Sequence, residues 1–166
     1  ELSGGRAFVG IGAGGGLTLD PLGIVRDRPL TAVAEMVDGL RRLFAGDRVE
    51  HDGHAFSFRD ARLTYARRGI EIILAGRGPR MTELGGRVAD GFNLSYVHKD
   101  LLGDHSRTLR DAASDRPFRI TYSTMIAITD AEYDDARAQL TFRLVDSPAA
   151  VKERIGMVHE TDELGR

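Results

Sequence analysis

The stretch IEIILAGRGPRMTELGGRVADGFNLSYV, residues 70–97, decides how the rest of the chain is interpreted. It opens with the run Ile70–Leu74, which is apolar except for Glu71 and is typical of a strand buried on both faces, as parallel strands covered by helices are. Pro79 then suits the first position of a helix, where a missing N–H costs nothing. Asp90 and Gly91 turn the chain into a second apolar strand. The stretch therefore predicts a strand–helix–strand unit.

The turn between that strand and its helix, Gly76–Arg80, predicts an anion site. The first N–H groups of a helix have no intrahelical partner, and the helix dipole adds about 0.3–1 kcal/mol to anion binding at an exposed site. Arg77 and Arg80 place two positive charges beside these groups. Phosphate is the ligand that the arrangement favours. The alternative is a tight turn with two solvated arginines that binds nothing.

Composition indicates an ordinary globular domain. The chain has 166 residues, 42% of them apolar and 29% charged, so we expect a single domain over residues 1–166. A formal net charge of −2 gives no reason to expect nucleic acid or an anionic membrane as partner. The absence of cysteine excludes disulfides, thiolate metal sites and a cysteine nucleophile. No apolar run approaches a membrane span and no signal peptide is visible, so a cytoplasmic location is expected.

A strand is also predicted upstream, over residues 7–12, and it ends in a glycine-rich segment. Gly10, Gly12 and Gly15 match the dinucleotide-binding pattern G-x-G-x-x-G. That pattern requires a helix to open inside the glycine turn, whereas residues 17–28 are predicted to be a loop broken by proline and glycine. We therefore interpret the segment as a strand end whose backbone a cofactor approaches. The alternative is a flexible surface loop.

The remaining sequence alternates helices with strands. Pro29–Gly46 has the strongest helical periodicity, and Val49–Tyr65 has the alternation and Asp-Gly turn of a β-hairpin. The same criteria predict a helix over 99–113 and a long strand over 118–129. The capping box Thr129–Glu132 predicts a helix that runs to about residue 140. Ser147–Pro148 predicts the start of a last helix, with Val151, Ile155 and Val158 as its apolar stripe. About four parallel core strands alternating with helices predict an α/β fold, either half of an eight-stranded barrel or an open doubly wound sheet.

Three segments, in this order, resemble the luciferase-like oxidoreductase superfamily: GGRAFVGIGAGG (4–15), RPLTAVAEMVDGLRRLFAGDRVEHDGHAFSF (28–58) and IILAGRGPRMTELGGRVADGFNLSY (72–96). That family contains flavin-dependent monooxygenases and reductases that use the deazaflavin coenzyme F420. The resemblance implies a (β/α)8 barrel of the TIM type with the cofactor at the carboxyl ends of the strands. The predicted strands correspond to the family's fourth to seventh, so we expect a partial barrel without the first three strands and the last.

The resemblance also implies which residues contact the cofactor. They are Ala13, Gly14 and Thr18 after the upstream strand, and Gly76, Arg77, Gly78, Arg80 and Met81 at the phosphate turn. The implied function is an oxidoreductase or monooxygenase that uses reduced deazaflavin (F420 type) or FMN on a small-molecule substrate, and the Gly-Pro-Arg-Met turn favours deazaflavin. No catalytic residue carries over, because the family's ring- and substrate-contacting residues lie on the strands without counterparts here.

A different class of function stays open at this point. The chain could be a non-catalytic half-barrel that binds a phosphorylated ligand or acts as an oligomerising fragment. A partial barrel has two unpaired sheet edges, and such edges pair readily with another chain. We therefore expect a homo-oligomer if the chain is complete, and a monomer by light scattering would contradict this.

Histidines and small polar residues are the other candidates for chemistry. His51 and His54 flank the hairpin turn, where both are expected to face solvent, and no further ligand is fixed by spacing, so no metal site is predicted. His98 is the best general-acid candidate, against the alternative of a surface histidine in a loop. The alternation in residues 92–95 and 121–123 puts small polar groups on one strand face, which predicts a wetted cavity or a poorly sealed core.

Overall fold

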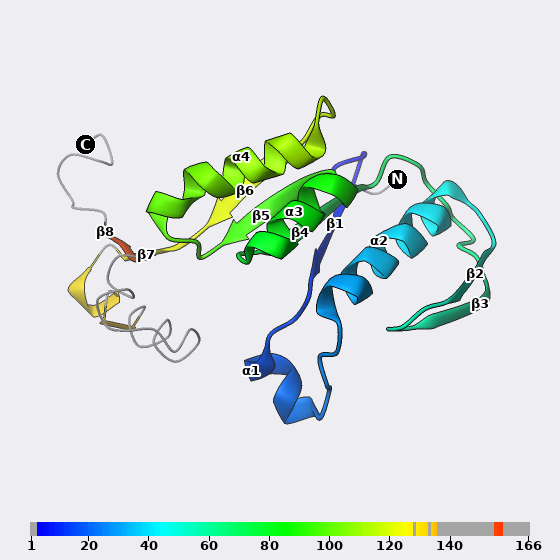
Figure 1. Ribbon diagram of the computed structural model, residues 1–166, viewed down its shortest axis with the longest axis horizontal. Coiled ribbons are helices and arrows are strands. Elements are labelled where there is room, and N and C mark those ends of the chain that lie inside the picture. The colour runs from blue at the N-terminus through cyan, green and yellow to red at the C-terminus, as the bar shows by residue number, and fades with distance from the viewer. Residues whose placement is uncertain (1–2, 128, 133, 136–154, 158–166) are drawn as a thin grey trace.

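A parallel four-stranded sheet in the order β1-β4-β5-β6 forms the centre of the molecule (Figure 1). The computed structural model describes residues 3–127, 129–132, 134–135 and 155–157. The sheet consists of β1 (Phe8–Gly12), β4 (Glu71–Gly76), β5 (Gly91–Ser95) and β6 (Arg119–Ser123). The helices that pack on it are α2 (Pro29–Ala45), α3 (Pro79–Val88) and α4 (Leu102–Ala113). The predicted parallel α/β arrangement is confirmed.

Short elements connect these parts. They are α1 (Gly16–Leu19), the 3-10 turns η1 (Asp20–Leu22) and η2 (Lys99–Leu101), and the antiparallel hairpin of β2 (Val49–Asp52) and β3 (Ser57–Ala61). The hairpin lies beside α2 in Figure 1. A separate parallel pair joins β7 (Met125–Ala127) to β8 (Ile155–Met157).

All three long helices cover the same face of the sheet, which holds the hydrophobic core. Ile72 and Leu74 of β4 and Phe92 and Leu94 of β5 alternate along their strands and are buried on this face. They pack against Val33 and Val37 of α2, Leu84 of α3 and Leu109 of α4. Each side chain of this size contributes about 1.5–3 kcal/mol when it is fully buried.

Glycines set how closely α3 approaches its neighbours. A Cβ added at Gly85 would lie 2.2 Å from Cδ2 of Phe92, and one added at Gly86 would lie 2.6 Å from Cβ of Ala112. Both distances are far below van der Waals contact, so α3 packs directly on β5 and on α4 because these positions carry no side chain.

The structure corrects three of the expected elements. Residues 118–129 do not form one strand, because β6 ends at Ser123 and the chain resumes as β7 in a different sheet. Ile155 lies in β8 rather than in a last helix, because its backbone pairs with Met125. Residues 17–28 are not wholly loop, since α1 and η1 occupy their first part. The rest of the expected helix from Ser147, and the end of the preceding one, lie outside the described residues.

The expected capping box is confirmed. Thr129 N donates to the Glu132 carboxylate at 3.0 Å, and Glu132 N donates to the Thr129 hydroxyl at 3.3 Å. This reciprocal pair satisfies two backbone donors where the helical residues 130–132 begin.

Candidate functional site

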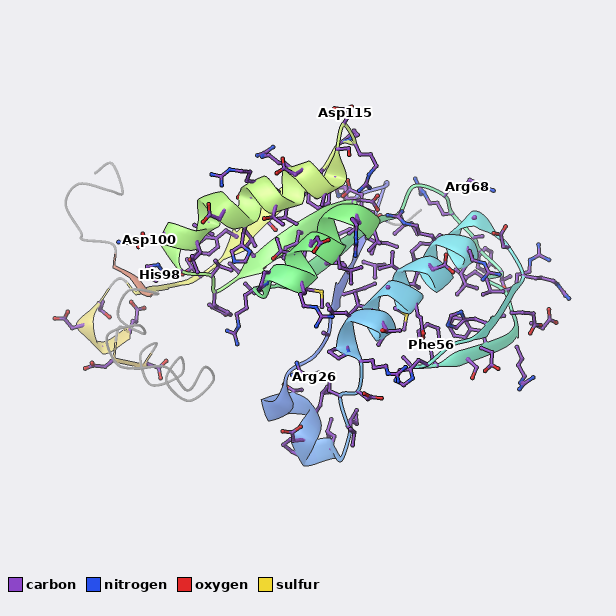
Figure 2. All side chains as sticks on the ribbon, viewed as in Figure 1. Arg26, Phe56, Arg68, His98, Asp100 and Asp115 are labelled. Carbon is purple, nitrogen blue, oxygen red and sulfur yellow. The ribbon has the colours of Figure 1, made fainter. Side chains whose placement is uncertain are left out.

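The carboxyl ends of the four parallel strands lie at one edge of the sheet, and the predicted cofactor-binding residues follow two of these ends. Gly12 at the end of β1 pairs with Ala75 of β4, so the segments after β1 and after β4 leave the sheet side by side. In Figure 2, His98 and Asp100 mark this edge, whereas Arg68 and Asp115 mark the opposite, amino edge. Ligands of parallel α/β folds bind at the carboxyl edge.

The turn before α3 is held by a chain of hydrogen bonds beneath it. Thr82, which is fully buried, donates both its backbone N–H (2.9 Å) and its hydroxyl (3.0 Å) to the carbonyl of Gly78. Nδ1 of His105, from α4, lies 3.0 Å from the same hydroxyl oxygen. The buried hydroxyl thus connects the turn to α4. The carbonyl at the turn is thus directed into the protein, as an N-terminal helix cap requires.

The outer side of this turn is open. Gly78 caps α3 with extended backbone (φ −86°, ψ 145°), and a Cβ added to it meets no atom within 4 Å. Arg77 and Arg80 are exposed, and within the part of the chain that the structure describes neither forms an ion pair or hydrogen bond. Met81 does not fill the corner, because its side chain packs back against the core beside Gly76. The turn can therefore accept an anion without rearrangement.

The segment after β1 provides backbone and hydroxyl groups at the same edge. Gly14 has φ +69°, in the left-handed region, and a Cβ there would lie 2.7 Å from Cδ1 of Leu19, so glycine is required. Ala13 packs against the core, which leaves only its backbone for a ligand, whereas Thr18 is exposed on α1.

Arg26 is a residue of this segment that the sequence did not indicate. Its guanidinium donates to the carbonyl of Gly14 at 2.9 Å and fixes the loop after β1 (Figure 2). Its partner is a backbone carbonyl 12 residues earlier in a region predicted to be loop. Neither periodicity nor a motif marks such a contact.

Two hollows of similar volume lie at opposite ends of the sheet. One, of about 490 Å³, lies beside Gly12 and Ala13 and is walled by the loop holding Arg26, by α2 and by the hairpin turn at His54. The other, of about 510 Å³, lies at the amino edge around Arg41, Arg68, Glu71, Asp90 and Arg116. The first adjoins the predicted cofactor-binding residues, and the second adjoins none of them.

Of the two hairpin histidines, which were both expected to face solvent, His51 is largely buried and His54 is exposed. The side chain of His51 is only 16% exposed, because its ring packs on Phe56 with centroids 4.8 Å apart. Its Nε2 lies 3.6 Å from a carboxylate oxygen of Glu35. His54 is exposed as expected and pairs with Asp27 at 2.9 Å. Among the described residues no group of three or more potential ligands could hold a metal ion.

Glu35 connects the hairpin to α2. Its carboxylate accepts the backbone N–H of His54 at 2.9 Å and of Ala55 at 3.1 Å. These two hydrogen bonds, first His54 and then Ala55, stabilise the charged form and lower the pKa of Glu35 below its ordinary value. The wall of the hollow beside β1 is thus anchored to the helix that covers the core.

His98 lies at the carboxyl edge as expected, after β5. Its side chain is 18% exposed, and its Nδ1 accepts the backbone N–H of Asp100 at 3.3 Å. The ring is therefore already engaged with its own loop. Tyr96, two residues earlier, has φ +54°, an uncommon backbone conformation for a residue with a side chain.

Comparisons with known proteins agree with this fold. The model of the family "Luciferase-like monooxygenase" matches residues 1–163. The chain is 32% identical to the 5,10-methylenetetrahydromethanopterin reductase of Archaeoglobus fulgidus over 95% of its own length and 50% of the reductase. It is 37% identical to the enzyme of the same name from Methanolobus tindarius over 59% of this chain and 30% of that protein. The chain thus spans half or less of these curated relatives.

Solved structures with the same fold are more distant in sequence. The coenzyme F420-dependent tetrahydromethanopterin reductase of Methanopyrus kandleri superposes with a TM-score of 0.73 at 23% identity, covering 92% of this chain and 51% of that one. An F420-dependent secondary alcohol dehydrogenase, solved with an F420–acetone adduct, gives 0.72 at 20% identity and covers 95% and 58%. The parallel sheet described above is therefore part of a luciferase-like barrel, and the chain belongs to the luciferase-like monooxygenase family.

Proposed function

We propose that this chain carries the coenzyme-binding part of an oxidoreductase that uses the deazaflavin coenzyme F420. The observation that carries the proposal is the open turn before α3, where Gly78 leaves space and where Arg77 and Arg80 are exposed and, among the described residues, have no ion pair or hydrogen bond. Relatives named as F420-dependent, including a glucose-6-phosphate dehydrogenase of Beutenbergia cavernae at 37% identity over 55% of this chain, support deazaflavin as the cofactor. FMN, the other coenzyme expected from the sequence, has no such support.

In this proposal five of the predicted residues contact the coenzyme directly. The first N–H groups of α3 and the guanidinium groups of Arg77 and Arg80 bind the phosphate of the coenzyme. The backbone of Ala13 and Gly14 and the hydroxyl of Thr18 contact it at the end of β1. The His105–Thr82 chain keeps the carbonyl of the turn directed away from the anion. The coenzyme itself, when bound, supplies hydride exchange with a small organic substrate.

Coenzyme titration tests the proposal. F420 is added to the purified chain and binding is followed by its fluorescence, in the parent and in the double variant Arg77→Ala plus Arg80→Ala. Each lost charge-assisted contact weakens binding, so we expect the dissociation constant to rise at least about tenfold, or about 1.4 kcal/mol. Titration with FMN under the same conditions measures the preference between the two coenzymes.

A matched control separates the site from net charge. Arg59→Ala plus Arg110→Ala removes the same charge from β3 and α4, and we expect it to leave the affinity within about twofold because exposed charges far from a ligand are screened. Equal loss in both double variants, or no binding of F420 to the parent, would refute the proposal.

Self-association of the chain stays a prediction, and light scattering at micromolar concentration decides it. β1 and β6 are the outer strands of the central sheet, which is where a second chain would pair. Among the described residues no helix has the length and apolar character needed to cross a bilayer.

A further inference from the structure

The face of the sheet opposite the helices is divided into a small-residue half and a polar half. Four residues lie side by side across the four strands, each the register partner of the next: Gly12, Ala75, Asn93 and Thr121. The β1–β4 side has almost no side chain there, and a Cβ added at Gly12 meets only the Ala75 carbonyl, at 3.8 Å. The β5–β6 side carries an amide and hydroxyls. Barrel interiors are usually filled by branched apolar residues, so a polar half requires an explanation.

The polar half is a connected network around Asn93. Its Oδ1 accepts hydrogen bonds from the hydroxyls of Ser95 and Ser123, each at 3.0 Å. Its Nδ2 donates to the hydroxyl oxygen of Thr121 at 3.0 Å, and Thr121 in turn donates to the carbonyl of Phe92 at 3.5 Å. Ser95 and Ser123 are register partners on β5 and β6, close to the carboxyl edge.

Counting protons shows what this network leaves for a ligand. Thr121 accepts from the amide nitrogen of Asn93, whose Oδ1 faces the two serines. Ser95 and Ser123 each direct their only proton to that oxygen. What remains unused is the lone pairs of two neighbouring hydroxyl oxygens and the second N–H of Asn93. The network offers mainly acceptors.

We propose that Asn93, Ser95 and Ser123 are specificity-determining residues that bind two hydroxyl groups of the substrate, so that the substrate class is a vicinal diol or polyol. Two adjacent hydroxyls of such a ligand donate to the two serine oxygens, and the remaining N–H of Asn93 donates to one of the ligand oxygens. A ketone or a hydrocarbon supplies no proton to the serine oxygens and leaves their lone pairs unused, which costs affinity. The inference rests on the proposed function only in assigning this ligand to the substrate.

The test uses the whole chain, at 18.2 kDa a convenient size for NMR, and two probes of matched size. cis-Cyclohexane-1,2-diol and cyclohexanone are titrated while the side-chain amide resonances of Asn93 are followed. We expect the diol to shift these resonances saturably and with a dissociation constant at least about fivefold below that of the ketone, the ratio of one good hydrogen bond. Equal or tighter binding of the ketone, or no saturable shift with the diol, would overturn the proposal.

Variants locate the binding. Ser95→Ala and Ser123→Ala are each expected to weaken the diol about three- to fivefold without changing the ketone. Thr108→Ala on α4, whose hydroxyl donates to the carbonyl of Asp104, is the control that removes a hydroxyl from the other side of the sheet. If Thr108→Ala weakens the diol as much as the serine variants, the assignment is wrong.

The F420 titration keeps this result separate from the proposed function. Diol binding without F420 binding would refute the coenzyme proposal and leave the polar network as a polyol site. F420 binding without diol selectivity would refute the network proposal alone. A further arm repeats the diol titration with F420 present, where we expect the diol affinity to be unchanged or higher because the small-residue half beside the network is free to hold the coenzyme.

Discussion

The two faces of the central sheet differ most clearly along β5. Toward the helices, Phe92 and Leu94 are buried among apolar side chains of three helices. On the other face, the Asn93 side chain forms hydrogen bonds with Thr121 and Ser123 of β6 and with Ser95 of its own strand. Asn93 and Ser95 both stay partly exposed. Residues one position apart therefore have different physical tasks. Along β5, alternate residues thus serve stability on the helix side and recognition on the other side. Substitutions at neighbouring positions can test this separation.

The largest expected effect on stability comes from removing the side chain of Phe92, the largest of the fully buried side chains in the described part of the chain. Phe92→Ala leaves a cavity between β5 and α3, and such changes typically cost about 3–5 kcal/mol of unfolding free energy. Asn93→Ala, one residue along, removes hydrogen bonds on the accessible face and is expected to cost only about 1 kcal/mol. Urea denaturation of both variants and the parent measures the two values. Similar losses would show that the faces contribute equally, contrary to the comparison.

The next effect comes from crowding the apolar face instead of emptying it. Gly85→Ala drives a Cβ to within 2.2 Å of the Phe92 ring, so we expect a loss of about 1–3 kcal/mol despite the better helix propensity of alanine. Gly103→Ala in α4 is the matched control, because a Cβ there meets nothing within 4 Å and the change should stabilise slightly. Denaturation midpoints of the two variants should therefore move in opposite directions. A midpoint that rises for Gly85→Ala would contradict the close packing of α3 on β5.

A third effect concerns the polar anchor of the hairpin and depends on pH. The folded-state pKa of Glu35 lies below its ordinary value of 4.5, so its stabilising contribution is complete above that value and is lost as the pH falls through the folded-state pKa. Glu35→Gln should be less stable than the parent at pH 7, and the difference should shrink in acid. Urea midpoints across the acid range measure this. Glu83→Gln, on the exposed side of α3, is the control for the loss of a carboxylate. A constant gap for Glu35→Gln would exclude the anchor.

Local patterns predicted the parts of the fold that depend on local chemistry. The strand–turn–helix from Ile70 through Pro79, the helix from Pro29 and the capping box at Thr129 were all confirmed, because periodicity, proline and reciprocal caps act within a few residues. The division of residues 118–129 between two sheets was missed, since β-branched residues favour a strand wherever it pairs.

The candidate site was predictable only where a single turn creates it. Arg77 and Gly78 directly precede α3 and Arg80 lies in its first turn, so one short stretch of sequence indicated both the turn and its charge. Arg26 to Gly14 and His105 to Thr82 join segments that only the fold brings together, and no spacing rule contains them. The contact between His51 and Glu35 was missed for the same reason, because it joins the hairpin to α2.

The smallest effect on stability is expected at Gly78, and it is also the sharpest test of the open turn. Gly78→Ala adds a Cβ in open space at a φ of −86°, which alanine adopts without strain, so the unfolding free energy should stay within about 0.5 kcal/mol of the parent. The same methyl group stands where an anion would approach the first N–H groups of α3, so the affinity for F420 should fall. Gly103→Ala again controls for the added methyl group. A variant that keeps its stability but loses coenzyme affinity assigns the space beside Gly78 to the ligand, whereas unchanged affinity would show that the phosphate lies elsewhere.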